Sequence, residues 1–123
     1  MKVLLCEPGQ YAREITIQQD LKSMQAIVGG TIEVTYPWED PVAVVCNDEG
    51  LILGLPLNRR LSEHTIIAGT FFVCGLGEEN LADLSPALME KYRRILHYPQ
   101  FFIRTGSGIL AIPYDPKGGD GDG

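Results

Sequence analysis

The chain has 123 residues, of which 45% are apolar and 21% are charged, and its formal net charge is −6. This length supports one domain with a single core, and this composition excludes a disordered or fibrous protein. A general nucleic-acid coat would need an excess of basic residues, whereas here 10 Lys and Arg are outnumbered by 16 Asp and Glu. The composition therefore predicts a small, acidic, globular domain.

No part of the sequence resembles a membrane anchor or a secretory leader. The apolar run at residues 3–6 ends at a Glu-Pro-Gly turn at 7–9, and no run approaches the roughly 20 residues that span a bilayer. Cys6, Cys46 and Cys74 lie far apart beside aliphatic residues, which predicts reduced core thiols rather than a disulfide framework or a zinc site. We therefore expect a cytoplasmic protein with no membrane association, no metal and no other cofactor.

The first elements predicted along the chain are a hairpin and a helix. Residues 3–6 form the first arm of the hairpin. Residues 12–17, after the turn, alternate apolar and polar side chains, which is typical of the second arm. Asp20 fits the N-cap of a helix whose apolar residues recur at helical spacing. Gly29 and Gly30 end that helix, since glycine adopts the left-handed conformation without penalty.

Four extended segments follow the helix. Residues 31–36 alternate in polarity, whereas residues 42–46 are continuously apolar, which is typical of a strand buried on both faces. A turn at 47–50 leads into residues 51–57, an extended stretch broken by a glycine and a proline. Residues 66–74 are rich in β-branched and aromatic side chains, so we expect a central strand there.

The last third of the chain predicts a helix and a second hairpin. Ser85 suits a helix N-cap, and Pro86 suits the first helical position. Strands at 101–104 and 109–112 flank a tight, glycine-containing turn. The fold class predicted from this order is α+β, with an antiparallel or mixed β-sheet and two helices packed on one face.

The end of the chain differs in composition from the rest. We expect residues 1–114 to form a single α+β domain and residues 115–123 to be a disordered tail rich in Gly and Asp. The tail holds three Asp and one Lys, and therefore −2 of the net charge of −6.

No arrangement of residues predicts catalysis. His64 and His97 lie in polar or helix-end positions, without a nucleophile or an acid at a suggestive spacing. The glycines at 75 and 77 lack the third glycine of a dinucleotide-binding loop, and acidic residues follow them. Cys74, at the end of an apolar strand, is expected to be an inert core thiol. We therefore predict that the protein is not an enzyme, and we name no catalytic residue.

The strongest candidates for ligand binding lie in the segment Gly-Leu-Pro-Leu-Asn-Arg-Arg at 54–60. Arg59 and Arg60 stand beside an apolar strand, where a guanidinium fork can hold a carboxylate or a phosphate. Asn58 supplies both a donor and an acceptor for a base edge or a ribose. By residue type alone, the plainer interpretation of solvated charges and a turn residue is favoured over the anion clamp.

A second candidate is the proline-bounded loop that contains the single tryptophan. Trp38, with Tyr36 beside it, offers an aromatic plane that could stack on a base or on a side chain of a partner. The alternative, in which Trp38 covers the edge of the core, is equally consistent with the sequence.

Several spaced motifs occur in order along the chain: Val28-Gly29-Gly30-Thr31-Ile32-Glu33, Asp40-Pro41-Val42, Cys46-Asn47-Asp48-Glu49-Gly50, Gly54-Leu55-Pro56-Leu57-Asn58-Arg59 and Ile66-Ile67-Ala68-Gly69-Thr70-Phe71-Phe72-Val73. This series resembles a domain-of-unknown-function family of small proteins from phages, plasmids and other mobile elements of bacteria. The resemblance covers about residues 1–96, and residues 101–123 depart from it. It implies a counter-defence role in the cytosol of the bacterial host, and it implies no established reaction.

The resemblance and the Asn-Arg segment together predict a sponge, a homo-oligomer that sequesters a small nucleotide immune signal without catalysis. In this hypothesis the phosphate is bound by arginines, the polar edges of the base and ribose by asparagines, and the base stacks on an aromatic side chain. The candidate residues are Arg59, Arg60, Arg104, Asn58, Asn47, Trp38 and Tyr36. The alternative is a protein-binding inhibitor of a host defence system, such as an anti-CRISPR. A hydrolase of the same signals ranks last, because the sequence offers no positioned base or metal.

Overall fold

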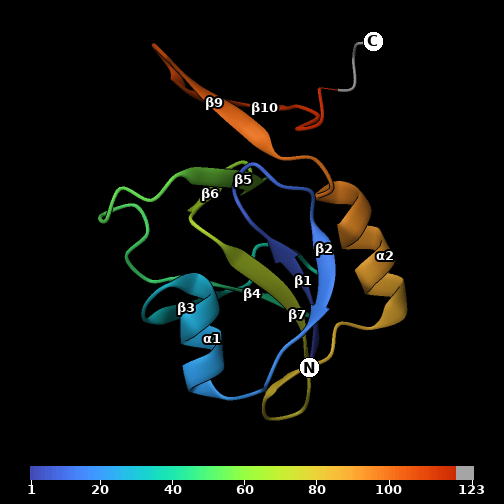
Figure 1. Ribbon diagram of the computed structural model, residues 1–123. Helices are drawn as coiled ribbons and strands as arrows, with labels where there is room; N and C mark the ends of the chain where they lie inside the picture. The colour runs from blue at the N-terminus through green and yellow to red at the C-terminus, as the bar shows by residue number, and fades with distance from the viewer. Residues whose placement is uncertain (119–123) are drawn as a thin grey trace.

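Five strands of the main sheet lie side by side in the order β2-β1-β7-β4-β3, and a sixth strand, β8, pairs with the end of β7 (Figure 1). The computed structural model describes residues 1–118. The sheet is built from β1 (Lys2–Cys6), β2 (Arg13–Thr16), β3 (Ile32–Thr35), β4 (Val42–Asn47), β7 (Phe71–Leu76) and β8 (Leu81–Ala82). Every pairing in it is antiparallel. The α+β class is therefore confirmed, and the sheet is antiparallel rather than mixed.

The three middle strands of this sheet are apolar on both faces. The register places Val73 of β7 opposite Leu4 of β1 on one side and opposite Val44 of β4 on the other. Every residue of β4 is buried, as the apolar run at 42–46 predicts. Strands that are apolar on both sides need a covering layer on each face of the sheet.

Both helices begin, and the first one also ends, where their capping signals predict. α1 spans Leu21–Val28, and the backbone N–H of Ser23 donates to the Asp20 carboxylate at 2.7 Å. Gly29 ends α1 in the left-handed conformation, with a φ of 82°. α2 spans Pro86–Ile95, and its N-cap is Ser85.

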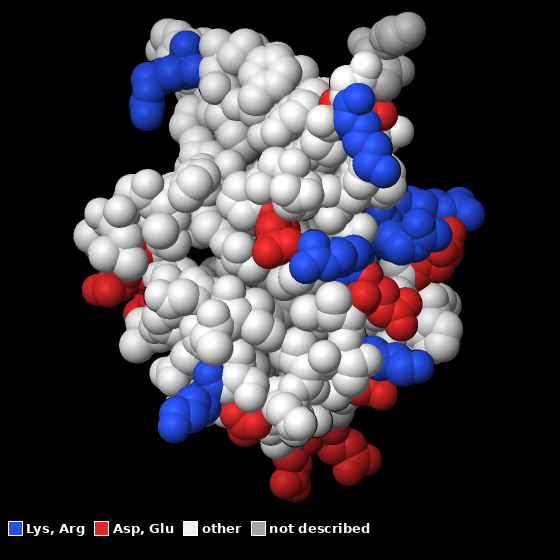
Figure 2. Space-filling view, in the orientation of Figure 1, with Lys and Arg blue, Asp and Glu red and all other residues white. Residues whose placement is uncertain are grey.

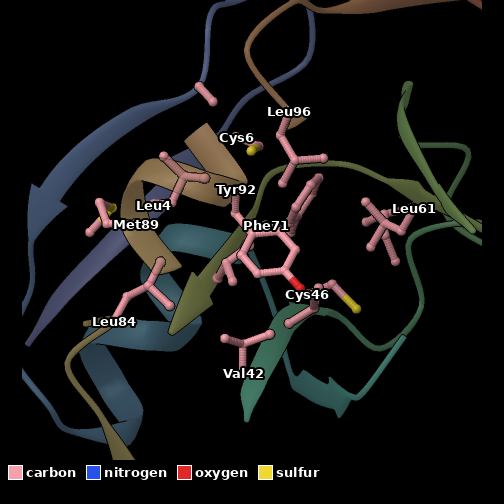
Figure 3. Close-up of a cluster of buried hydrophobic side chains, with 14 residues drawn as sticks. Leu4, Cys6, Val42, Cys46, Leu61, Phe71, Leu84, Met89, Tyr92 and Leu96 are labelled. Carbon is pink, nitrogen blue, oxygen red and sulfur yellow. The ribbon is translucent and has the colours of Figure 1, made fainter. Parts of the chain in front are cut away.

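The helices cover opposite faces of the sheet, so the prediction that both pack on one face is wrong. One core cluster joins the sheet to α2 and includes Leu4, Val42, Phe71, Met89, Tyr92 and Leu96 (Figure 3). The other joins the opposite face to α1 and includes Val3, Leu5, Val45, Phe72 and Val28, with Met24 and Ile27 packed against it. The reason is the alternation of side chains along a strand, which sends successive apolar residues to opposite faces.

The single central strand predicted at 66–74 is two strands in two different sheets. β6 (Thr65–Ala68) pairs with β5 (Leu57–Ser62) in a small two-stranded sheet, whereas β7 lies in the main sheet. Gly69 between them has a φ of 84°, a left-handed conformation that turns the chain and that favours glycine. The extended stretch predicted at 51–57 is also wrong, because residues 48–54 form turns and β5 begins only at Leu57.

The predicted C-terminal hairpin is confirmed, as β9 (Gln100–Thr105) and β10 (Gly108–Pro113). It projects beyond β5 at one end of the molecule (Figure 1). Beyond it, the Tyr11 hydroxyl donates to the Asp115 carboxylate, and the backbone N–H of Lys117 donates to the same carboxylate at 2.9 Å. Asp115, the first residue of the predicted tail, thus contacts Tyr11 of the domain. Residues 119–123 of that tail lie outside the described residues.

Candidate functional site

Asn58 of β5 is fully buried, with a relative exposure of 0%. Its side-chain nitrogen donates to the carbonyl oxygen of Cys6 at 3.0 Å and to that of Gly69 at 2.8 Å. These two bonds connect the end of β1 to the turn between β6 and β7. Asn58 therefore satisfies buried backbone acceptors and presents no edge to a ligand.

Arg59 is also fully buried, and its donors are used by neutral oxygen atoms of the protein. Nε donates to the carbonyl of Leu96 at 3.0 Å and Nη2 to that of Gln10 at 2.7 Å. Nη1 donates to the Asn58 side-chain oxygen at 2.7 Å and to the Glu7 carbonyl at 3.4 Å. Burial lowers the pKa of Arg59, because desolvation disfavours the charged form. Asn58 and Arg59, where the sequence predicted an anion clamp, are therefore both buried, with their side chains bonded to other parts of the protein.

The other polar candidates are divided among different parts of the fold. Asn47 is buried, donates to the Val28 carbonyl at 3.1 Å and accepts from the Glu49 backbone at 2.7 Å, so it fixes a turn. Arg60 donates to the carbonyls of Glu63 and Ile109 and so connects β5 to the hairpin. Arg104 is exposed on β9. No described contact joins these residues into one site.

Tyr36 and Trp38 do lie together, in a surface depression of about 670 Å³. The Trp38 indole N–H donates to the Leu61 carbonyl at 3.0 Å, and its ring centroid lies 4.4 Å from that of Tyr92. Trp38 therefore covers the core beside α2, whereas Tyr36 remains 60% exposed. Of the two interpretations of the loop, the geometry favours core cover for Trp38 and an accessible aromatic face for Tyr36.

Asp40 and Lys91, two of the charged residues in this depression, are paired with each other. Asp40 accepts from the Lys91 ammonium and from the Tyr92 hydroxyl, each at 2.6 Å. The hydrogen bond from Lys91, followed by that from Tyr92, lowers the pKa of Asp40 below its ordinary value. Lys91 is the only Lys or Arg among the lining residues, so an anion entering here would compete with Asp40 for it.

The sequence did not predict the most exposed apolar feature of the described chain. The turn that follows β4 presents three consecutive aliphatic side chains to solvent: Leu51 is 67% exposed, Ile52 84% and Leu53 58%. We call these three residues the apolar turn, and it lies in the loop that projects at the left of Figure 1. The sequence signal was present, since the strong turn motif at 47–50 runs directly into three aliphatic residues and a glycine.

The backbone of the apolar turn is fixed by hydrogen bonds and by close packing on β6. The N–H of Leu53 donates to the Glu49 carbonyl at 2.8 Å, and that of Leu55 to the Gly50 carbonyl at 3.0 Å. A Cβ on Gly50 would lie 2.6 Å from the Ala68 carbonyl oxygen, so the turn touches the β6 backbone. The backbone under the apolar side chains is therefore held by hydrogen bonds and by contact with β6.

The surroundings of the apolar turn are acidic. Glu33, Asp48 and Glu49 line a hollow of about 230 Å³ beside Leu51 and Ile52. Residues 23–58 contain five acidic residues and no Lys or Arg. In Figure 2 the surface over this loop, at the left, is uncoloured with red atoms beside it and no blue ones.

The three cysteines are free and buried, as predicted. Burial raises the pKa of Cys6 and of Cys74 to about 12, which keeps both thiols protonated. Within residues 1–118 there is no group of three or more His, Cys, Asp or Glu that could hold a metal ion. No helix in the same range is long and apolar enough to cross a membrane.

Together, the fold and the surfaces define a small antiparallel α+β protein in which Asn47, Asn58 and Arg59 are structural and the apolar turn is exposed. Residues 1–97 match the family described as a domain of unknown function (DUF3846), so the chain belongs to that family. The match ends just before the hairpin, close to the limit of about residue 96 expected from the motifs. Searches of curated proteins and of solved structures found no match.

Proposed function

We propose that this protein is a non-catalytic binding protein that attaches to another protein through its apolar turn. The observation that carries the proposal is the exposure of three neighbouring aliphatic side chains, Leu51, Ile52 and Leu53, on a hydrogen-bonded turn. A monomeric protein rarely exposes contiguous apolar groups without a partner to cover them. Aliphatic anchors that enter a pocket supply much of the energy of a protein interface.

Charge defines the kind of surface that the apolar turn fits. Glu33, Asp48 and Glu49 surround its base, and residues 23–58 contain no Lys or Arg. The complementary surface is an apolar pocket with Lys or Arg at its rim. An anionic membrane is disfavoured, because the same carboxylates would be repelled by it. The resemblance to proteins of mobile elements suggests that the partner is a defence protein of the bacterial host, which the protein would inhibit by occupying that pocket.

In-cell crosslinking at one position tests this proposal. A photo-activated phenylalanine derivative is introduced at position 52, and separately at position 21 as a control, because Leu21 is also an exposed aliphatic residue at 56%. We expect one discrete protein adduct from position 52 and none from position 21. Adding Glu49→Lys should reduce the yield at 52 by removing charge complementarity. The proposal fails if position 52 gives no protein adduct, or the same adducts as position 21.

A nucleotide ligand is the second candidate, and the depression beside α2 favours it. Tyr36 presents an aromatic face there, with Lys91 as a cation at the same surface, and aromatic stacking on a base contributes about 1–3 kcal/mol. Calorimetric titration with cyclic dinucleotides and ADP-ribose derivatives tests this candidate. Binding should weaken roughly tenfold or more in Tyr36→Ala and the ligand should be recovered unchanged. The absence of heat from all of these compounds would reject the sponge.

A further inference from the structure

One face of the C-terminal hairpin is apolar and exposed. The register places Phe101 opposite Ile112 and Ile103 opposite Leu110, and directly opposed residues share a face. We call these four residues the hairpin face. Phe101 is 46% exposed, Ile103 43% and Leu110 53%. The face carries no charged residue.

The other face of the hairpin is attached to the rest of the molecule. The backbone N–H of Arg60 donates to the Gln100 side-chain oxygen at 2.9 Å, and the Arg60 guanidinium donates to the Ile109 carbonyl. These bonds hold the hairpin in place with its apolar face directed away from β5. A two-stranded hairpin is marginally stable by itself, so covering its free face with a second apolar layer would stabilise it.

A hollow lies next to the hairpin face. It has a volume of about 280 Å³ and is lined by Tyr98, Pro113, Tyr114 and Asp115. The ring centroids of Phe101 and Tyr114 are 6.0 Å apart, so the hollow adjoins the hairpin face. A surface that has both projecting side chains and a hollow can be complementary to a copy of itself across a two-fold axis.

We propose that the hairpin face is the contact surface of a homodimer, in which two copies place their hairpin faces against each other. The projecting side chains and the adjoining hollow favour a second copy as the occupant. Two molecules that each carry −6 repel over most of their surfaces, and the acidic surroundings of the apolar turn would place like charges together. The hairpin face avoids this repulsion because it is uncharged. In Figure 2 the surface at the top of the molecule is white between a blue group at its upper left and blue and red groups at its upper right.

The size of the face sets the strength of the expected dimer. Six-residue strands give a ribbon face roughly 20 Å long and 10 Å wide, or about 200 Å² per copy, against about 800 Å² per partner in a standard stable interface. The adjoining tyrosine hollow increases this area without reaching that value. We therefore expect a dimer that dissociates on dilution. This inference does not depend on the proposed function, because the apolar turn and the hairpin face share no residue.

Sedimentation velocity of the full chain, from low micromolar to sub-millimolar concentration, tests the proposal. The wild-type protein should shift from monomer to dimer as concentration rises. Leu110→Lys should remain monomeric throughout, because a desolvated ammonium would face the second copy. Leu21→Lys, a matched change on α1, should dimerise as the wild type does. Circular dichroism and a thermal melt establish that each variant is folded.

Three outcomes would overturn the homodimer. The first is a wild-type protein that stays monomeric at the highest concentration. The second is a Leu110→Lys variant that dimerises like the wild type. The third is a Leu21→Lys variant that loses the dimer as completely as Leu110→Lys, which would place the contact elsewhere.

Discussion

Arg59 shows how one side chain can join its own strand to two distant parts of the chain at once. Its acceptors come from the β1–β2 turn, at Glu7 and Gln10, from the residue after α2, at Leu96, and from Asn58 beside it. A planar fork of several donors suits spaced acceptors of this kind, which a single ammonium cannot reach together. The Asn-Arg motif is therefore a structural connection between elements.

Removing the guanidinium should destabilise the protein strongly. Arg59→Met leaves buried carbonyl groups without donors, and we expect a loss of about 3–5 kcal/mol in the free energy of unfolding. Arg59→Lys should also be destabilising, because it keeps the charge but loses the fork. Arg93→Met is the matched control: Arg93 is exposed on α2 with one ion pair to Glu90, and we expect a change within about 0.5 kcal/mol.

Urea titration of the three variants measures these differences. Equal midpoints for Arg59→Met and Arg93→Met would contradict the structural role of Arg59. That result would also reopen the possibility of an accessible anion site at β5.

The role of Arg59 could not be predicted from its neighbours in the sequence. The N–H donors of a guanidinium can bind either a phosphate or several backbone carbonyls, so the residue type does not distinguish the two roles. The choice between them is made by residues near positions 10 and 96, which a local motif does not contain. The apolar turn was missed for the opposite reason, since aliphatic residues after a turn signal are more often strand than exposed surface.

At the scale of elements, local signals predicted most of the structure. Caps at Asp20 and Ser85 located both helices, and alternation or apolar runs located β1 to β4. The predictions failed where the structure is determined by pairing between segments that are distant in the sequence. The division of 66–74 into two strands depends on which sheet each half joins. The placement of the helices follows from the two apolar faces of β4, each of which needs its own covering layer.

Gly75 of β7 illustrates a constraint between elements that can be tested by one substitution. It pairs with Ala82 of β8, and a Cβ built on it would lie 2.2 Å from the Asp83 carbonyl oxygen. Backbone cannot move aside as a flexible side chain can, so Gly75→Ala should lower stability by about 1–3 kcal/mol. Gly106→Ala is the control, because nothing lies within 4 Å of a Cβ there. Differential scanning calorimetry compares the melting temperatures of the two variants. An unchanged melting temperature for Gly75→Ala would show that the β8 backbone can shift to accommodate the methyl group without loss of stability.

At the scale of the whole molecule, the net charge of −6 is concentrated in one stretch. Residues 23–58 have five acidic and no basic residues, and they include the apolar turn. Because exposed charges are screened beyond about 8–10 Å at physiological salt, this concentration affects partners of the apolar turn more than partners of the hairpin face. The two apolar surfaces therefore differ in what they can contact. The apolar turn, with its acidic surroundings, lies within residues 1–97, which match the family. The uncharged hairpin face lies in the segment beyond them.

The bonds of Arg59 also affect the order in which the chain can fold during synthesis. They join residues 37, 49 and 52 positions apart, and the central strand β7 pairs with β1 from the opposite end of the unit. Contacts so distant in sequence form slowly and only after the later segment exists. We therefore expect the emerging chain to stay unfinished until the ribosome has released residue 96, with the N-terminal hairpin exposed for most of translation and the C-terminal hairpin added last.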